Sequence, residues 1–193
     1  MSGLCSLLGD MDKIQTRKHF LRLRNSLPEE QIISMSREIT KKVTEILGSY
    51  SSLAVFLNYG SEVITRDIVG YAFDKKMTVA VPKVIDRENM VFIKISENEK
   101  FIKDRHGIEE PVFDKDRILK TDKDTLIIVP GLVFGLDMHR IGYGGGYYDR
   151  FLSRNEYSKA VGVCFDFQLI DSLEKESTDM DLDGVITDRR VVL

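Results

Sequence analysis

The sequence predicts an α/β protein with a mostly parallel sheet flanked by helices. Short apolar segments of strand length recur along the chain, and segments with helical spacing separate several of them. The strand-like segments are uninterrupted apolar runs, which is typical of strands buried on both faces of a parallel sheet. The expected strands are 53–57, 78–82, 125–130 and 159–165.

Four helices are expected between and before these strands. A basic segment at 12–24 is interpreted as the first helix. The second begins at "SLPEE", where we expect Ser26 to cap it, and Gly48 ends it. Its apolar residues from Ile32 to Leu47 recur at helical spacing. Thr65 is expected to cap a third helix, which carries apolar residues from Ile68 to Phe73, and a fourth spans 145–155.

Two further segments have different patterns. Residues 90–95, "MVFIKI", alternate in polarity and predict a half-buried strand. The charged segment 96–103 is interpreted as a surface hairpin or loop.

Length and charge narrow the class of protein. The chain has 193 residues, of which 31% are charged, and its net charge is −3. This length suits a single domain, for which we expect residues 1–12 to form a flexible tail. The acidic balance argues against broad binding to nucleic acid or membrane surfaces, and no apolar run approaches the ~20 residues that a membrane span needs. Without an export signal or a cysteine motif, we expect a cytoplasmic protein.

The segment 129–152, "VPGLVFGLDMHRIGYGGGYYDRFL", is the most unusual part of the chain. Five of the chain's 14 glycines lie from Gly135 to Gly146. A buried strand precedes this loop and a helix follows it, an arrangement that favours phosphate binding at the carboxyl end of the sheet. The loop matches neither a P-loop nor the dinucleotide fingerprint. A tight turn that packs a helix on a sheet is the alternative.

Two charged residues flank the glycines. Arg140 lies two residues before Gly142 and could bind a phosphate through two hydrogen bonds. Asp149 lies in the first turn of the expected helix. A carboxylate there either complements the helix dipole or holds Mg²⁺ beside bound phosphates.

This segment closely resembles the signature of the 5-formyltetrahydrofolate cyclo-ligase family, roughly V-P-G-x-x-F, then R-L-G-x-G-x-G-Y-Y-D-x-x-L. Ile141 replaces the usual leucine. The residues that match are Pro130, Gly131, Phe134, Arg140, Gly142, Gly144, Gly146, Tyr147, Tyr148, Asp149 and Leu152. The resemblance implies ATP- and magnesium-dependent closure of 5-formyltetrahydrofolate to 5,10-methenyltetrahydrofolate, with release of ADP and phosphate. It also implies a fold of the sugar-phosphate-isomerase and CoA-transferase-like type.

The resemblance further implies an ATP site. It consists of Lys13, Arg17, Arg140, Ile141, Gly142, Tyr143, Gly144, Gly145, Gly146, Tyr147, Tyr148 and Asp149. Arg140 and Tyr147 would take part in catalysis, and Asp149 would hold Mg²⁺. Lys13 and Arg17 stand four residues apart and share a helix face, which by itself is equally typical of a solvated basic surface. Thr16 replaces a leucine of the family pattern.

The folate site and a second metal contact are implied in the same way. "VFLNYGSEVIT" resembles the family's folate loop, so Leu57 would line the pocket and Glu62 would bind the amino-pyrimidine edge of the pterin. Taken alone, Glu62 is an ordinary loop acid. Tyr147 would lie between nucleotide and folate. "STDMDLDGVIT" resembles a family motif with Thr178 in place of its histidine, and implies an indirect magnesium contact through Asp179.

Two other functions are compatible with parts of the sequence. A sugar-phosphate isomerase could use the loop for a substrate phosphate, but would need neither the Lys13/Arg17 pair nor Asp149. A non-catalytic nucleotide- or RNA-binding module could use the basic first helix, although the acidic net charge argues against it. We therefore expect a monomer that binds ATP and 5-formyltetrahydrofolate, and neither nucleic acid nor membranes.

Overall fold

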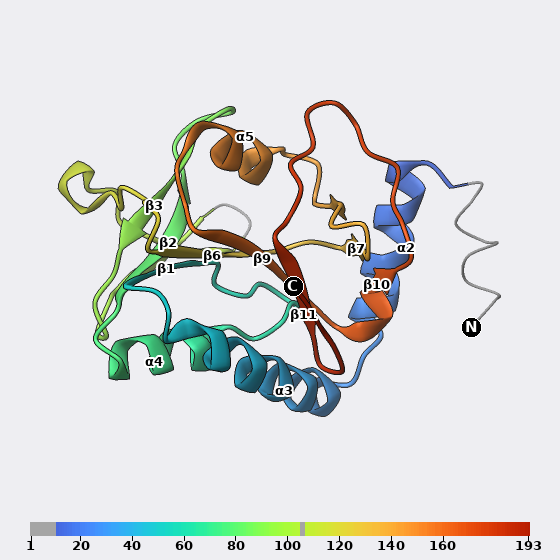
Figure 1. Ribbon diagram of the computed structural model, residues 1–193, viewed down its shortest axis with the longest axis horizontal. Helices are drawn as coiled ribbons and strands as arrows, with labels where there is room; N and C mark the ends of the chain where they lie inside the picture. The colour runs from blue at the N-terminus through green and yellow to red at the C-terminus, as the bar shows by residue number, and fades with distance from the viewer. Residues whose placement is uncertain (1–10, 105–106) are drawn as a thin grey trace.

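A seven-stranded sheet forms the centre of the molecule (Figure 1). The computed structural model describes residues 11–104 and 107–193, so most of the expected N-terminal tail lies outside it. The strand order is β12-β11-β9-β6-β1-β2-β3, in which the five strands from β11 to β2 run parallel and the two edge strands are antiparallel. The strands are β1 (Ser52–Val55), β2 (Thr78–Val84), β3 (Met90–Lys94), β6 (Thr125–Val129), β9 (Lys159–Cys164), β11 (Gly184–Thr187) and β12 (Val191–Val192). The predicted mostly parallel α/β architecture is confirmed.

Helices cover both faces of the sheet. α3 (Glu29–Leu47) and α4 (Arg66–Asp74) lie on one face, and α5 (Tyr147–Arg154) lies on the other (Figure 1). Alternate residues of β6 enter the two cores: Leu126 and Ile128 pack towards α3 and α4, whereas Ile127 and Val129 pack towards α5. All four side chains are fully buried, which explains why this strand is a continuous apolar run in the sequence.

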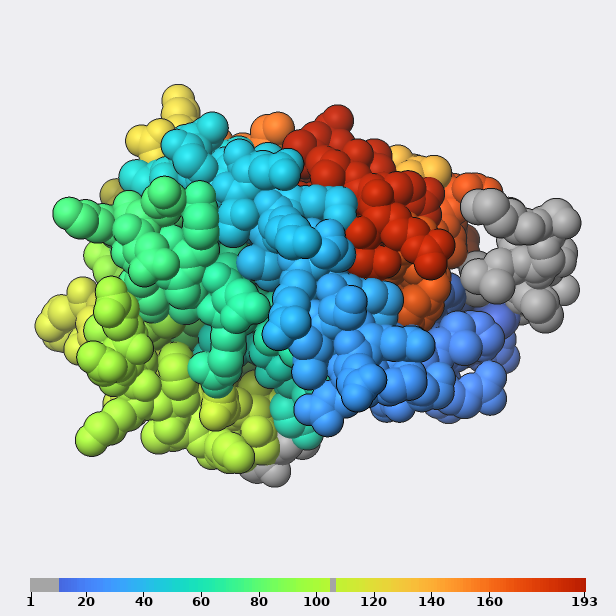
Figure 2. All heavy atoms as spheres, turned by 90° about the horizontal axis from the view of Figure 1, so that it is seen from below, coloured from blue at the N-terminus to red at the C-terminus, as the bar shows by residue number. Residues whose placement is uncertain are grey.

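The C-terminal strand β11 lies next to α3 on the face of the sheet that α3 and α4 cover. Seen from that side, the C-terminal segment lies beside α3 (Figure 2). Lys42 Nζ donates a hydrogen bond to the Asp188 carbonyl at 2.7 Å and joins the two. No helix in the described part of the chain is long and apolar enough to span a bilayer.

Short elements surround the main sheet. A second sheet has the order β10-β7-β8, made of β10 (Leu169–Ile170), β7 (Val133–Gly135) and β8 (Arg140–Ile141). Against it packs α2 (Lys13–Asn25), whose Phe20 is buried with Leu132 and Val133. The segment expected to be a hairpin or loop contributes β4 (Phe101–Lys103), which pairs with β5 (Glu109–Pro111). Two 3-10 turns complete the chain, η1 (Lys115–Arg117) and η2 (Asp166–Gln168).

The prediction that Ser26 caps α3 was wrong, whereas Thr65 has the predicted cap position but not a cap hydrogen bond. Ser26 ends α2 instead of starting α3, since its hydroxyl donates to the Leu23 carbonyl at 2.7 Å, and Pro28 is the residue before α3. Thr65 does precede α4, but its side chain makes no cap hydrogen bond. Its fully buried hydroxyl donates instead to the Phe56 carbonyl at 2.6 Å. A buried hydroxyl must find an acceptor, and the end of β1 supplies it.

Candidate active site

The sequence-predicted residues lie where the parallel strands end. β1, β6 and β9 are neighbours in the sheet, and ligands of such sheets bind beyond the carboxyl ends of the strands. The loop with Glu62 follows β1, and Gly131 follows β6. The sequence predicts that the glycine loop follows β6 directly, and this prediction is wrong. The antiparallel strands β7 and β8 intervene, with Val133 paired to Ile141, and return the chain to the site.

Two glycines give the loop its shape. Gly144 has φ +100° and Gly146 has φ +65°, conformations that residues with a side chain adopt rarely. Gly146 immediately precedes α5, so the loop leads into the N-terminal end of a helix. The amides at such an end, with the helix dipole, favour a bound anion.

Arg140 and Asp149 form an ion pair across this loop. Arg140 Nη1 lies 2.9 Å from Asp149 Oδ1, and the Arg140 side chain is only 4% exposed. The same Asp149 oxygen accepts a hydrogen bond from the Met180 amide at 3.2 Å. Arg140 Nε is buried and has no hydrogen-bond partner among the described residues. Because an unsatisfied buried donor costs about 1–3 kcal/mol, this atom fits a site for a bound anion such as a phosphate.

Lys13 and Asp179 are brought together from opposite ends of the chain. Lys13 Nζ lies 2.7 Å from Asp179 Oδ2 and 2.9 Å from Glu176 Oε1. Burial acts to lower the pKa of Lys13, but its hydrogen bonds to Asp179 and Glu176 outweigh this and raise the pKa. Burial likewise acts to raise the pKa of Asp179, and the hydrogen bonds from Lys13 and the Glu176 amide lower it overall. Lys13 is therefore a cation and Asp179 an anion at neutral pH.

Arg17 lies one helical turn after Lys13 and contacts the glycine loop. Its Nε donates to the Gly142 carbonyl at 2.9 Å. A side chain at Gly144 would meet the Arg17 guanidinium at 3.6 Å, so the two are direct neighbours. Arg17 thus contacts the loop from α2 and Arg140 lies at its start in β8, while Lys13 pairs with Asp179, a carboxylate that Arg140 also influences. Since these two elements are far apart in sequence, the structure brings together three cations at a site suited to several phosphates.

Glu62 contacts the same loop from another direction. Its Oε1 accepts a hydrogen bond from the Tyr143 hydroxyl, and its Oε2 accepts the Tyr59 amide at 2.8 Å. Burial raises the pKa of Glu62, while these two hydrogen bonds and the charge of Arg24 act to lower it. The Tyr143 side chain therefore belongs to the Glu62 end of the site, although the sequence placed this residue only with the ATP loop.

Four other predicted residues lie around this cluster. Leu57 and Ile141 are buried in the hydrophobic cores. The Tyr147 hydroxyl donates to the Asp86 carbonyl at 3.2 Å, so its side chain reaches the turn between β2 and β3. The Tyr148 hydroxyl is buried without a partner among the described residues, and burial raises its pKa, which keeps it neutral.

Arg24 was not assigned a function from the sequence. It is 4% exposed and donates to three segments of the site. Helical spacing could have identified it. Arg17 and Arg24 follow Lys13 by four and eleven residues, so all three share one face of α2.

The donors present fit Mg²⁺ bound jointly with phosphates. No group of three or more His, Cys, Asp or Glu side chains that could hold a metal ion occurs in residues 11–104 and 107–193. Mg²⁺ is usually held by one or two carboxylates together with substrate phosphates. Asp149 binds Arg140 and the Met180 amide through Oδ1, and its Oδ2 can serve as such a ligand.

Comparison with known proteins decides the family. The model of the 5-formyltetrahydrofolate cyclo-ligase family matches residues 10–188. The chain belongs to this family. A probable 5-formyltetrahydrofolate cyclo-ligase of Schizosaccharomyces pombe is 30% identical over 86% of the chain and 90% of its own length. The 5-formyltetrahydrofolate cyclo-ligase of Escherichia coli K12 is 27% identical, with 88% and 96% covered.

A solved structure supports the same assignment. The 5,10-methenyltetrahydrofolate synthetase of Aquifex aeolicus superimposes with a TM-score of 0.80 at 28% identity, covering 94% of this chain and 92% of that one. The predicted cyclo-ligase family membership is confirmed, and with it the prediction that the chain is an enzyme.

Proposed function

We propose that this cyclo-ligase family member converts 5-formyltetrahydrofolate to 5,10-methenyltetrahydrofolate, using ATP and Mg²⁺ and releasing ADP and phosphate. Three observations together carry the proposal: Arg17 and Arg140 lie at the glycine loop, Lys13 pairs with Asp179, and Tyr143 of the loop donates to Glu62. The cations suit a triphosphate, and Glu62 suits the amino-pyrimidine edge of a pterin.

The proposed reaction has two steps. The N5-formyl oxygen attacks the γ-phosphorus of ATP, and the bond to the ADP oxygen breaks. N10 then attacks the activated formyl carbon, loses its proton, and the carbon–oxygen bond breaks as phosphate leaves. Phosphoryl transfer depends on positioning and charge neutralisation more than on a protein nucleophile. A site built of cations, loop amides and a single helix terminus meets that need.

Each side chain then has a defined task. Arg140 Nε and the Lys13 and Arg17 cations neutralise the phosphates, and the amides of the glycine loop bind phosphate oxygens. Mg²⁺ would be held by Asp149, with an indirect contact from Asp179, and would offset phosphate charge when bound. Glu62 orients the pterin and Leu57 borders its pocket. Tyr147 lies between the nucleotide and the folate.

One assay tests the proposal. Purified protein with 5-formyltetrahydrofolate, ATP and Mg²⁺ should develop the near-ultraviolet absorbance of the methenyl product. The signal should be lost without ATP and after chelation of the metal. Absence of product across a range of pH and divalent metals would reject the assignment. We also expect a cytoplasmic monomer, which size-exclusion chromatography with light scattering and fractionation of cells would check.

A further inference from the structure

Arg24 joins three segments of the site from the last turn of α2. Its Nε donates to Ser61 Oγ at 3.1 Å, its Nη1 to the Gly131 carbonyl at 3.4 Å, and its Nη2 to the Tyr143 hydroxyl at 2.7 Å. The acceptors lie after β1, after β6 and in the glycine loop. A buried charge is costly unless its hydrogen bonds are satisfied, and here each guanidinium nitrogen has its own acceptor.

Arg24 and Glu62 are connected by two hydrogen bonds through the Tyr143 hydroxyl, and the donor and acceptor of each bond are fixed. A guanidinium can only donate and a carboxylate can only accept. The Tyr143 hydroxyl between them accepts from Arg24 and must therefore donate to Glu62 Oε1. The Tyr59 amide holds the other carboxylate oxygen at 2.8 Å. A carboxylate has about four lone-pair positions, so both oxygens can still accept from a ligand.

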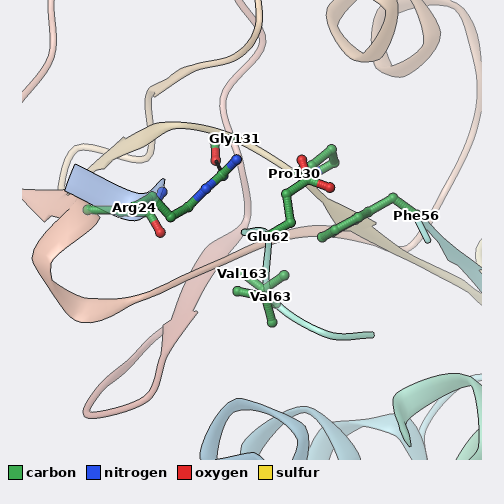
Figure 3. Close-up of a pocket in the computed structure, with 8 residues that line it drawn as sticks. Arg24, Phe56, Glu62, Val63, Pro130, Gly131 and Val163 are labelled. Carbon is green, nitrogen blue, oxygen red and sulfur yellow. Dashed lines mark hydrogen bonds between the residues drawn. The ribbon is translucent and has the colours of Figure 1, made fainter. Parts of the chain in front are cut away.

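The surroundings prevent Glu62 from turning inwards. Glu62 is 8% exposed, and beside it lies a cavity of about 10 Å³ that Arg24, Phe56, Pro130 and Gly131 also line (Figure 3). This is about the room that one water molecule needs, so it cannot accept a rotated carboxylate. Tyr143, in contrast, is 50% exposed and lies where a ligand can approach.

We propose that Arg24 is a positioning residue of the folate site, which acts through the Tyr143 hydroxyl to fix the orientation of the Glu62 carboxylate. This rests on the proposed function, in which Glu62 receives the pterin. It also gives Tyr143 a second task. Its backbone belongs to the glycine loop, whereas its hydroxyl holds the carboxylate that would select the folate.

Steady-state kinetics of four variants test the inference. Arg24→Gln removes the hydrogen bond between Arg24 and Tyr143, and Tyr143→Phe also removes the hydrogen bond between Tyr143 and Glu62. The double variant combines the two changes. Arg22→Gln is the matched control, because Arg22 is exposed on the same turn of α2. We expect each single variant to raise the KM for 5-formyltetrahydrofolate about tenfold, as for loss of a hydrogen bond to a charged group. The KM for ATP and kcat should stay close to wild type.

The double variant distinguishes a connected series of hydrogen bonds, from Arg24 through Tyr143 to Glu62, from two independent contacts. Its folate KM should be no higher than that of the more affected single variant, since both changes interrupt the same series of bonds. A general structural role would instead lower the melting temperature and raise both KM values. Either that pattern or fully additive effects would overturn the inference.

A pH profile provides a second readout. Among the described residues, Arg24 from α2, Tyr143 from the glycine loop and Tyr148 from α5 are charged or titratable groups that interact with Glu62. Loss of the Arg24 charge should move the acid limb of kcat/KM for the folate to higher pH, and Arg24→Lys should partly restore it. An unchanged acid limb in Arg24→Gln would contradict the inference.

The outcomes also distinguish this inference from the function on which it rests. If the wild-type protein forms no methenyl product, the proposed function fails and the inference fails with it. If the wild type is active but Tyr143→Phe keeps the wild-type KM for the folate, only the inference fails. Tyr143→Phe decides the question even if Arg24→Gln does not fold, because it removes one hydroxyl from a half-exposed ring.

Discussion

Arg140 in β8 and Asp149 in α5 are joined by an ion pair of 2.9 Å that spans the glycine loop. The pair lies at the base of the loop, where Arg140 is almost fully buried. It fixes the distance between the strand that enters the loop and the helix that leaves it. The charge on each partner is therefore balanced in the ligand-free protein, while Arg140 Nε and Asp149 Oδ2 remain available to a ligand.

Asp149→Asn should reduce kcat/KM for ATP by about 100-fold or more, because it removes both the proposed metal ligand and the counter-charge of Arg140. Circular dichroism should show a retained fold, since the amide keeps the shape and one acceptor oxygen. Asp124→Asn, at an exposed acid before β6, is the control and should leave the rate unchanged. A fully active Asp149→Asn enzyme would remove Asp149 from the site.

Lys13→Ala should raise the KM for ATP by about tenfold or more, as expected when a charge-assisted hydrogen bond to phosphate is lost. Lys18→Ala is matched in charge and helix, but Lys18 is exposed and lies on a different face of α2 from Lys13, five residues along the helix. The comparison is made by titrating ATP at saturating folate. Equal KM values for the two variants would mean that Lys13 only pairs with Asp179 and Glu176.

Gly144→Ala should lower stability by about 1–3 kcal/mol, because φ +100° is strained for alanine. Activity should fall as well, since the loop would relax away from Arg17. Gly70→Ala is the opposite case: Gly70 lies within α4 with open space around it, and alanine should stabilise that helix by about 1 kcal/mol. Urea unfolding of both variants checks the two signs, and a stable, active Gly144→Ala would contradict the loop geometry.

Acid should weaken the C-terminal strands through Asp166. This carboxylate accepts Arg190 Nε at 2.7 Å and the Thr187 hydroxyl at 2.8 Å. Burial acts to raise its pKa, but the hydrogen bonds from Arg190 and Thr187 lower it below 3.8. A carboxyl with a lowered folded-state pKa contributes stability above its unfolded value and loses it as pH falls through the folded value.

Melting temperatures measured from about pH 6 to pH 2 test this dependence. The difference between wild type and Asp166→Asn should be constant above the unfolded pKa and shrink below it. A difference that is the same at every pH would show that ionisation of Asp166 does not stabilise the fold.

Much of the fold was predictable because its signals are local. Helical spacing predicted α3, and continuous apolar runs predicted β1, β6 and β9, within a few residues of their observed bounds. β7, β8 and β10 were missed, since strands of two or three residues show no periodicity. β11 and β12 were missed as well, although they also belong to the main sheet. Ser26 does not cap α3 because its hydroxyl bonds back to the Leu23 carbonyl at the end of α2, and Thr65 makes no side-chain cap hydrogen bond because its hydroxyl bonds to the Phe56 carbonyl.

By itself, the sequence determined the α/β class, the glycine loop, the position of Asp149 in the first helical turn and the family. These depend on residue types at short, fixed spacings. Only the tertiary structure decided which side chains meet. Lys13 contacts Asp179 across 166 positions, and Arg24 contacts Tyr143 across 119. Such pairs form because α2 packs against the small β10-β7-β8 sheet beside these loops, and no local pattern in the sequence specifies that packing.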